Sequence, residues 1–201
     1  AMFGVWVQDK TGERFVDELA NRKVRADAIM TLLNEGIHCY AVADAKGVEP
    51  MSISRPGLLQ KMLERGCVKQ YETLEALAAG EKINIEGLRK SVEEWNSAVK
   101  SGTDAHFKRY VNKKAQPMGT GPWYVSTMVP KVHHCMGGIY TDMQARALDI
   151  STDEPIPGLF AAGEATGGVH GAVRLGSCAV TDCLVYGRIA GRTAAQNESW
   201  M

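Results

Sequence analysis

The chain has 201 residues, 45% of them hydrophobic, which suits one or two globular domains with a buried core. Its 23 basic residues balance 23 acidic ones, so it lacks the basic excess typical of nucleic-acid-binding proteins. No run of about 18 apolar residues occurs, and we therefore expect neither a membrane span nor a nucleic-acid partner. The five cysteines show no CxxC spacing, so neither a disulfide framework nor a zinc site is indicated.

The first 120 residues combine short strands with helical segments. The pattern predicts strands at 5–8 and 38–45 and helices at 22–36, 55–66, 73–79 and 84–102. Apolar residues in the first helix recur at helical spacing, and Gly36 ends it. Val92, Trp95 and Val99 share one face of the last helix, and we expect that face to lie in the core.

Glycine becomes frequent after Pro122, and the expected elements change. The pattern predicts strands at 123–129 and 138–142, a hairpin region at 144–156, a buried strand at 158–163 and a helix at 179–195. Val180, Leu184 and Ile189 should lie on the inner face of that helix. We therefore place a boundary near residue 120.

Two adjacent histidines, His133 and His134, are followed by the sequence Met-Gly-Gly two residues later. If residues 132–135 are extended, successive side chains point to opposite faces, so the two imidazoles cannot serve the same neighbour. One ring would face a core or cofactor, and the other an open cleft. The alternative is a structural histidine beside a surface one, because histidine is both a common ligand and often only half-buried.

A strand, a glycine-rich turn and a helix follow one another at 158–195, an order that can bind anions at the helix N-terminus. Arg174 lies in the turn, and its planar guanidinium suits a carboxylate or phosphate. Glu164 ends the strand, where an acid often accepts from a ribose hydroxyl. Together they indicate a nucleotide-type cofactor and an anionic ligand, although each alone is also consistent with a loop, a surface pair or a cap.

Four blocks resemble, in the same order, the soluble fumarate reductase flavoproteins, a family that includes the flavocytochrome c fumarate reductases and urocanate reductase. The blocks are GERFVDELANR, SVEEWNSAVKSGTDAHFKR, VHHCMGGIYTD and GLFAAGEATGGVHGAVRLGSCAVTDCLVYGRIAG. The resemblance implies an α+β capping domain at 16–122, and the C-terminal return segment of an α/β Rossmann-like FAD-binding domain at 123–201. Residues 1–15 would be a return strand of the FAD domain that leads into the cap.

The resemblance also implies FAD as the cofactor and a small unsaturated carboxylate as the substrate. His133 matches the family histidine that contacts one substrate carboxylate, and Arg174 matches the arginine that clamps the other and polarises the double bond. Ser177 stands where the family has a substrate-contacting glycine. Arg22 matches the general acid, which would protonate one alkene carbon while flavin N5 transfers a hydride to the other.

Four residues match positions that bind the cofactor in this family. His134 would lie against the flavin, and Glu164 would bind the adenosine ribose. Ala179 and Val180 match backbone contacts to the isoalloxazine ring. The resemblance therefore implies a flavin-dependent oxidoreductase that acts on a CH–CH group.

The chain departs from the family pattern beside several of these residues. Lys23 replaces an acid next to the proposed proton donor. Val173 and Cys178 replace asparagines, and Ser177 is larger than the usual glycine. We therefore expect a substrate that is bulkier or less polar than fumarate.

The GxGxxG motif that holds the FAD pyrophosphate in this family does not occur in the chain. The resemblance therefore implies a C-terminal portion that needs an upstream FAD-binding half and an electron-donor protein or domain. On its own it should bind FAD weakly and turn over little. Two alternatives are a non-catalytic capping or partner module, and a dehydrogenase of ketosteroids or succinate. Family members occupy the bacterial cytoplasm or periplasm, and both remain open.

Overall fold

The computed structural model describes residues 4–197 and divides the chain into two units, one ending at Pro130 and the other beginning at Lys131. Each unit is described by itself. Unit 1 contains a four-stranded antiparallel sheet with the order β1-β2-β4-β3. Its strands are β1 (Val5–Gln8), β2 (Cys39–Asp44), β3 (Lys69–Tyr71) and β4 (Trp123–Met128).

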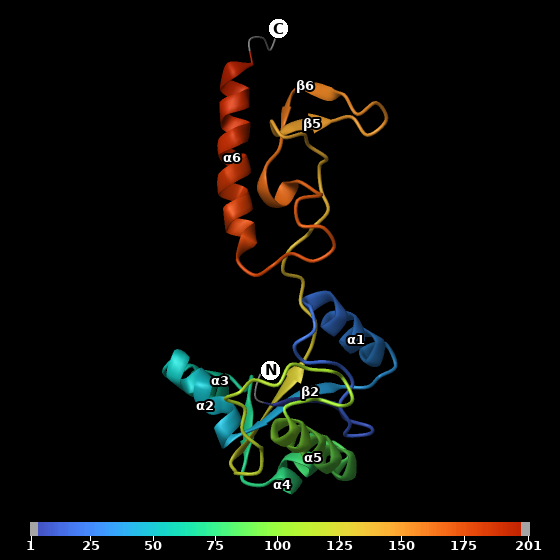
Figure 1. Ribbon diagram of the computed structural model, residues 1–201, viewed down its shortest axis with the longest axis vertical. Coiled ribbons are helices and arrows are strands. Elements are labelled where there is room, and N and C mark those ends of the chain that lie inside the picture. The colour runs from blue at the N-terminus through green and yellow to red at the C-terminus, as the bar shows by residue number, and fades with distance from the viewer. Residues whose placement is uncertain (1–3, 198–201) are drawn as a thin grey trace. The chain divides into compact units, whose positions relative to one another are not determined.

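Five helices accompany this sheet (Figure 1). They are α1 (Arg22–Asn34), α2 (Ala45–Ser54), α3 (Leu58–Glu64), α4 (Leu74–Glu81) and α5 (Ile85–Ser101). Side chains alternate along each strand, so each strand contributes residues to both faces of the sheet. Val5 and Val7 pack with α4 and α5 in the larger core, whereas Trp6 packs with Val16 and Ile29 of the α1 side.

Side-chain caps explain where the main helices of unit 1 begin. Asn21 accepts a hydrogen bond from Val24 N at the start of α1, and Asn84 accepts from Gly87 N at the start of α5. Trp95 on α5 is completely buried, which confirms that the predicted apolar face of this helix lies in the core.

The helix α2 was missed because its sequence contains Gly47 and Pro50, both of which disfavour helix interiors. The Asp44 carboxylate accepts a hydrogen bond from Gly47 N and caps this helix. The predicted helix at 55–66 is shorter in the structure, because Gly57 adopts a left-handed conformation immediately before α3.

The division after Pro130 differs from the expected boundary at residue 122, because β4 pairs with β2 and β3 and so belongs to the sheet of unit 1. Unit 1 is an α+β unit, and the chain mixes helices and strands as expected. Its assignment to a capping domain and a return segment remains a prediction.

Unit 2 consists of a hairpin, a short 3-10 helix and one long helix. The elements are β5 (Arg146–Leu148), β6 (Pro155–Phe160), η1 (Gly163–Ala165) and α6 (Cys178–Gln196). The strands β5 and β6 pair antiparallel, as the hairpin prediction required, and α6 packs against β6 and η1 (Figure 1).

Three expectations for unit 2 were wrong. Residues 138–142 form isolated bridges at Ile139 and Thr141 and no strand. The predicted buried strand is β6, which is only partly buried because β5 is its one strand partner among the described residues. On α6, Val180 and Leu184 are 66% and 70% exposed, and the one buried residue of this helix is Asp182.

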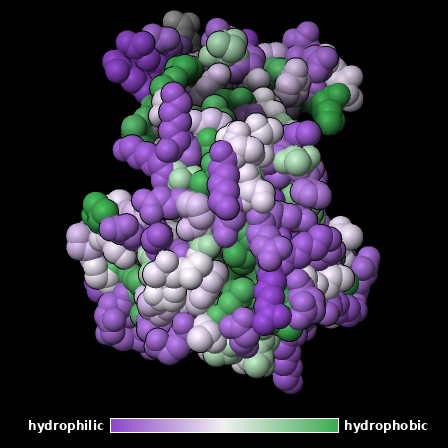
Figure 2. All heavy atoms as spheres, turned by 60° about the horizontal axis from the view of Figure 1, so that its bottom comes forward, coloured by the Kyte–Doolittle hydropathy of each residue, from purple (hydrophilic) through white to green (hydrophobic). Residues whose placement is uncertain are grey.

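Exposed apolar side chains occur in both units, and hydrophobic residues are visible among hydrophilic ones on the face drawn in Figure 2. Between residues 4 and 197, no helix combines the length and the apolar character that crossing a bilayer would require.

Candidate functional site

The two adjacent histidines have different environments. His133 is exposed, whereas the His134 side chain is only 5% exposed. The segment around them belongs to no strand of the structure. The expected difference between the two rings is nevertheless present.

Glu164 of η1 holds the buried ring. Its Oε2 lies 3.3 Å from His134 Nδ1, and its Oε1 accepts a hydrogen bond of 3.1 Å from Cys135 N. The Cys135 N–H is the main cause that lowers the pKa of Glu164, and the charges of His134 and Arg174 act in the same direction. This carboxylate is therefore ionised at neutral pH. His134 Nε2 is buried and has no hydrogen-bond partner among the described residues.

A second acid–imidazole pair lies beside the first. His170 Nε2 is 3.2 Å from Asp182 Oδ2, and the side chains are 12% and 3% exposed. The His170 ring meets the His134 ring edge to face, with 5.4 Å between the centroids. Sequence reasoning missed this pair. The available signal was a histidine in the glycine-rich turn followed by an acid inside the next helix.

Arg174 is 7% exposed, as a residue that holds a buried anion would be. Its Nη1 donates a hydrogen bond of 2.7 Å to Leu175 O, and its Nε has no partner among the described residues. A buried guanidinium needs acceptors for its donors, and a carboxylate or phosphate would supply them. Arg174 therefore remains a good candidate for binding an anionic group.

The helix α6 begins without a side-chain cap. Ser177 precedes it in a left-handed conformation with φ of 67°, and its exposed hydroxyl makes no capping bond. Ala179 is half-buried, Val180 is exposed, and the first turn carries no acidic residue. The N-terminus of α6 thus keeps the positive end of the helix dipole uncompensated by its own side chains.

The glycines after the histidine pair allow two backbone segments to approach each other. A Cβ on Gly138 would lie 2.4 Å from Ala165 O, and one on Gly167 would lie 2.8 Å from Gly138 N. Ile139 N donates to Ala165 O at this point, and Gly167 N donates to Ile139 O. The glycines therefore bring the histidine segment against the segment that carries Glu164.

Arg22 belongs to unit 1, and the other seven predicted site residues belong to unit 2. Arg22 is the first residue of α1 and is exposed, and its side chain makes no hydrogen bond or ion pair with another described residue. Lys23, which replaces the expected acid, forms an ion pair with Asp27. Within unit 2, the structure brings His134 and Glu164 into contact, with Arg174 near enough to affect the Glu164 carboxylate.

Known proteins show clear similarity to this chain. A urocanate reductase of Eggerthella lenta is 37% identical over 189 residues, which cover 93% of this chain and 30% of that protein. The open conformation of a flavocytochrome c3 fumarate reductase superposes with a TM-score of 0.69 at 34% identity, over 98% of this chain and 33% of that one.

A 3-ketosteroid Δ1-dehydrogenase from Sterolibacterium denitrificans, solved with 1,4-androstadiene-3,17-dione, superposes with a TM-score of 0.75 at 25% identity. That match covers 96% of this chain and 39% of the dehydrogenase. The chain thus spans well under half the length of each of these relatives.

The FAD binding domain family matches residues 3–180. This match takes in most of both units and confirms FAD as the predicted cofactor. The chain therefore belongs to the FAD binding domain family.

Proposed function

We propose that the chain is part of a FAD-dependent oxidoreductase that reduces the C=C bond of an α,β-unsaturated carboxylate. The similar proteins named above include a urocanate reductase and a fumarate reductase, and both of those names specify an unsaturated acid. In this proposal residues 16–122 act as a cap over the substrate, and residues 123–201 belong to the C-terminal part of the flavin domain.

The observation that carries the proposal is the buried Arg174 beside the ionised Glu164 and the enclosed His134 ring. A buried cation whose Nε has no partner among the described residues is poised to bind an anion. Such a cation would hold a substrate carboxylate and stabilise the negative charge that develops during reduction. The exposed His133 would contact the other end of the substrate.

The residues of unit 2 also fit the cofactor that the family implies. The buried His134 Nε2 offers an unused hydrogen-bonding atom, and the uncapped N-terminus of α6 suits an electron-rich group. His134, Ala179 and Val180 would contact the flavin ring, and Glu164 would bind the ribose while it orients His134. FAD, when bound, supplies the hydride.

Arg22 would supply the proton to the alkene carbon next to the one that receives the hydride. An arginine rarely loses its proton, so it must be reprotonated through a chain of partners as it donates. Lys23 has no carboxyl group, so it cannot take the place of the acid that the family has beside this arginine. It forms an ion pair with Asp27, an acid one turn further along α1. We infer that a partner other than Lys23 reloads Arg22.

The residues around Arg174 favour a substrate that is bulkier or less polar than fumarate. Val173, which precedes Arg174 in the sequence, is half-buried, and Ser177 adds a hydroxymethyl group at the N-terminus of α6. The likeness to a ketosteroid dehydrogenase suggests a steroid as the second candidate. A steroid nucleus has no carboxylate to pair with Arg174, and for that reason we favour the unsaturated acid.

The test uses the full-length flavoprotein that contains this chain, with its flavin reduced under anaerobic conditions. Urocanate, fumarate and a 3-ketosteroid are mixed in separately, and flavin absorbance reports reoxidation. We expect oxidation by at least one acid, and a fall of about 10- to 100-fold in kcat/KM for Arg174→Gln through loss of charge-assisted hydrogen bonds. Arg192→Gln, on the exposed part of α6, is the matched control.

Three results would contradict the proposal. Oxidation by the ketosteroid alone would favour the second candidate. A flavin that no electron acceptor of either class reoxidises would favour the non-catalytic module. Equal effects of Arg174→Gln and Arg192→Gln would remove Arg174 from the substrate site.

A further inference from the structure

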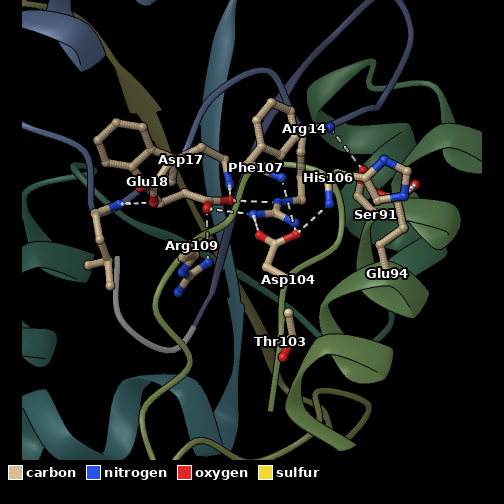
Figure 3. Close-up of polar contacts among 12 residues, drawn as sticks. Arg14, Asp17, Glu18, Ser91, Glu94, Thr103, Asp104, His106, Phe107 and Arg109 are labelled. Carbon is tan, nitrogen blue, oxygen red and sulfur yellow. Dashed lines mark hydrogen bonds and ion pairs between the residues drawn. The ribbon is translucent and has the colours of Figure 1, made fainter. Parts of the chain in front are cut away.

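A network of buried charges joins the loop between β1 and α1 to the segment that follows α5 in unit 1 (Figure 3). Glu18 is at its centre. Its Oε2 lies 2.8 Å from Arg14 Nη2 and 3.0 Å from Arg109 Nη1. Its Oε1 accepts hydrogen bonds from Arg14 Nε at 2.9 Å and from Trp6 N at 3.1 Å. Asp104 Oδ2 accepts a hydrogen bond of 2.7 Å from the same Arg14 Nη2.

Aromatic rings close the network off from water. Arg14 lies over the Phe107 ring at 4.9 Å, and Arg109 lies over the Trp95 ring at 4.0 Å. The side chains of Arg14, Glu18 and Arg109 are 0% exposed. Two cations thus balance two carboxylates, Glu18 and Asp104, in a fully enclosed space.

Stability alone does not account for such a network. Buried ion pairs lose much of their attraction to desolvation, and apolar replacements of similar volume are often as stable. What a network of bidentate bonds provides is geometry, because each carboxylate oxygen has a defined partner. The question is therefore which part of the chain this geometry holds in place.

The held part is the backbone that leads into α1. The carbonyl of Glu18 accepts a hydrogen bond of 3.2 Å from Arg25 Nη1, and Arg25 stacks over the Trp6 ring at 5.4 Å. Asn21 caps the helix immediately before Arg22. The short stretch from Glu18 to Arg22 is therefore fixed at both ends.

Arg22 itself has no bond to another described side chain, so its guanidinium depends on this backbone for its position. We propose that Glu18, clamped by Arg14 and Arg109, is a positioning residue that sets where Arg22 is presented for proton donation. This inference rests on the proposed function, in which Arg22 is the proton donor. A misplacement of about 1 Å can cost 100-fold in rate.

The test is kinetic and uses the full-length flavoprotein. Glu18→Gln keeps the shape of the side chain but removes the charge that Arg14 and Arg109 share. We expect kcat for the unsaturated acid to fall about 10- to 100-fold with KM and flavin content unchanged. The solvent deuterium isotope effect on kcat should increase, because proton delivery becomes slower than the other steps.

Two further variants separate positioning from general damage. Arg25→Gln removes the bond to the Glu18 carbonyl without touching the buried charges, and should produce the same rise in isotope effect on a smaller scale. Glu86→Gln removes an exposed ion pair with Arg89 and should change neither kcat nor the isotope effect. If Glu18→Gln does not fold, Arg25→Gln alone decides the question.

The outcomes distinguish this inference from the function on which it rests. A full kcat in Arg22→Gln, which has no cationic proton donor at this position, would overturn both. A strong loss in Arg22→Gln, with an unchanged isotope effect in Glu18→Gln and Arg25→Gln, would overturn only the positioning role of the clamp, the set of Arg14, Glu18, Asp104 and Arg109. Loss of flavin or a raised KM in Glu18→Gln, with no change in isotope effect, would likewise show that the network is only structural.

Discussion

Units 1 and 2 bury different kinds of side chain. Large apolar residues such as Trp95 and Leu77 fill the core of unit 1 and are completely enclosed. In unit 2, Ala145 and Ala147 are the only buried hydrophobic residues among those described, whereas Arg174 and Asp182 are buried and polar. Unit 1 therefore has the apolar burial that drives folding, and unit 2 concentrates the polar groups of the candidate site.

This contrast teaches that the residues of the candidate site and the apolar core that stabilises the fold lie largely in different parts of the chain. The exception is the clamp around Glu18, which places buried charges inside the better packed unit. The following predictions test how far the contrast extends.

The largest expected effect concerns the separate folding of the two units. Residues 1–130 expressed alone should unfold cooperatively in urea, because both apolar clusters lie within them. Residues 131–201 alone should show no cooperative transition, since their apolar burial is too small to offset the loss of chain entropy. Circular dichroism against urea concentration measures both. A sharp transition in the second piece would remove the contrast.

Breaking the clamp should have the next largest effect. Asp104→Asn should lower the free energy of unfolding of unit 1 by about 3 kcal/mol at pH 7, because it leaves a buried cation with one carboxylate fewer. The exposed pair Arg89–Glu86 offers the control Glu86→Gln, for which we expect a change of at most about 0.5 kcal/mol.

The same variant has a defined pH dependence. Burial raises the pKa of Asp104, but the hydrogen bond and charge of Arg14 outweigh it and hold the pKa below its usual value. A lowered pKa in the folded state stabilises the protein above the unfolded pKa of about 4 and loses that effect as the pH falls. The difference between wild type and Asp104→Asn should therefore shrink below about pH 4. A difference that is constant from pH 7 to pH 3 would contradict this.

A matched pair of leucines compares the two units directly. Leu77→Ala removes a completely buried side chain from unit 1 and should cost about 2–5 kcal/mol. Leu184→Ala removes a side chain that is 70% exposed on α6 and should cost at most about 0.5 kcal/mol. Urea midpoints of the two variants provide the measurement. Equal costs would mean that α6 is buried in solution.

The smallest effect is chemical and concerns the cysteines. Burial and the charge of Asp9 raise the pKa of Cys39 in unit 1 to about 11. Cys135 and Cys183 in unit 2 are exposed. Iodoacetamide at pH 8 should therefore label the unit 2 cysteines and leave Cys39 unmodified, as mass spectrometry of tryptic peptides would show. Labelling of Cys39 at an equal rate would contradict its burial.

Sequence reasoning located most elements of unit 1 because apolar periodicity and helix caps are local signals. It missed α2, whose helix depends on the Asp44 cap and tolerates Pro50. In unit 2 it predicted an inner face for α6 from periodicity, but the helix buries only Asp182. A periodic pattern indicates which side chains share a face and not whether another element covers it.

The candidate site shows the same limit. The opposite environments of His133 and His134 were foreseen, but their cause is the contact with Glu164 and not a strand. The pair His170–Asp182 joins residues 12 apart, and the pair Arg14–Asp104 joins residues 90 apart. Long-range polar partners leave no periodic trace in a sequence, and only the folded chain reveals them.

The distance along the chain between the partners of the clamp has a consequence for biosynthesis. Asp104 and Arg109 are translated long after Arg14 and Glu18. Arg14 and Asp104, for example, are 90 residues apart in the sequence. At ribosomal rates of about 5–20 residues per second, the loop before α1 waits roughly 5–20 s for its partners. During that interval Arg14 and Glu18 have each other but lack Asp104 and Arg109, so the clamp closes only as unit 1 nears completion.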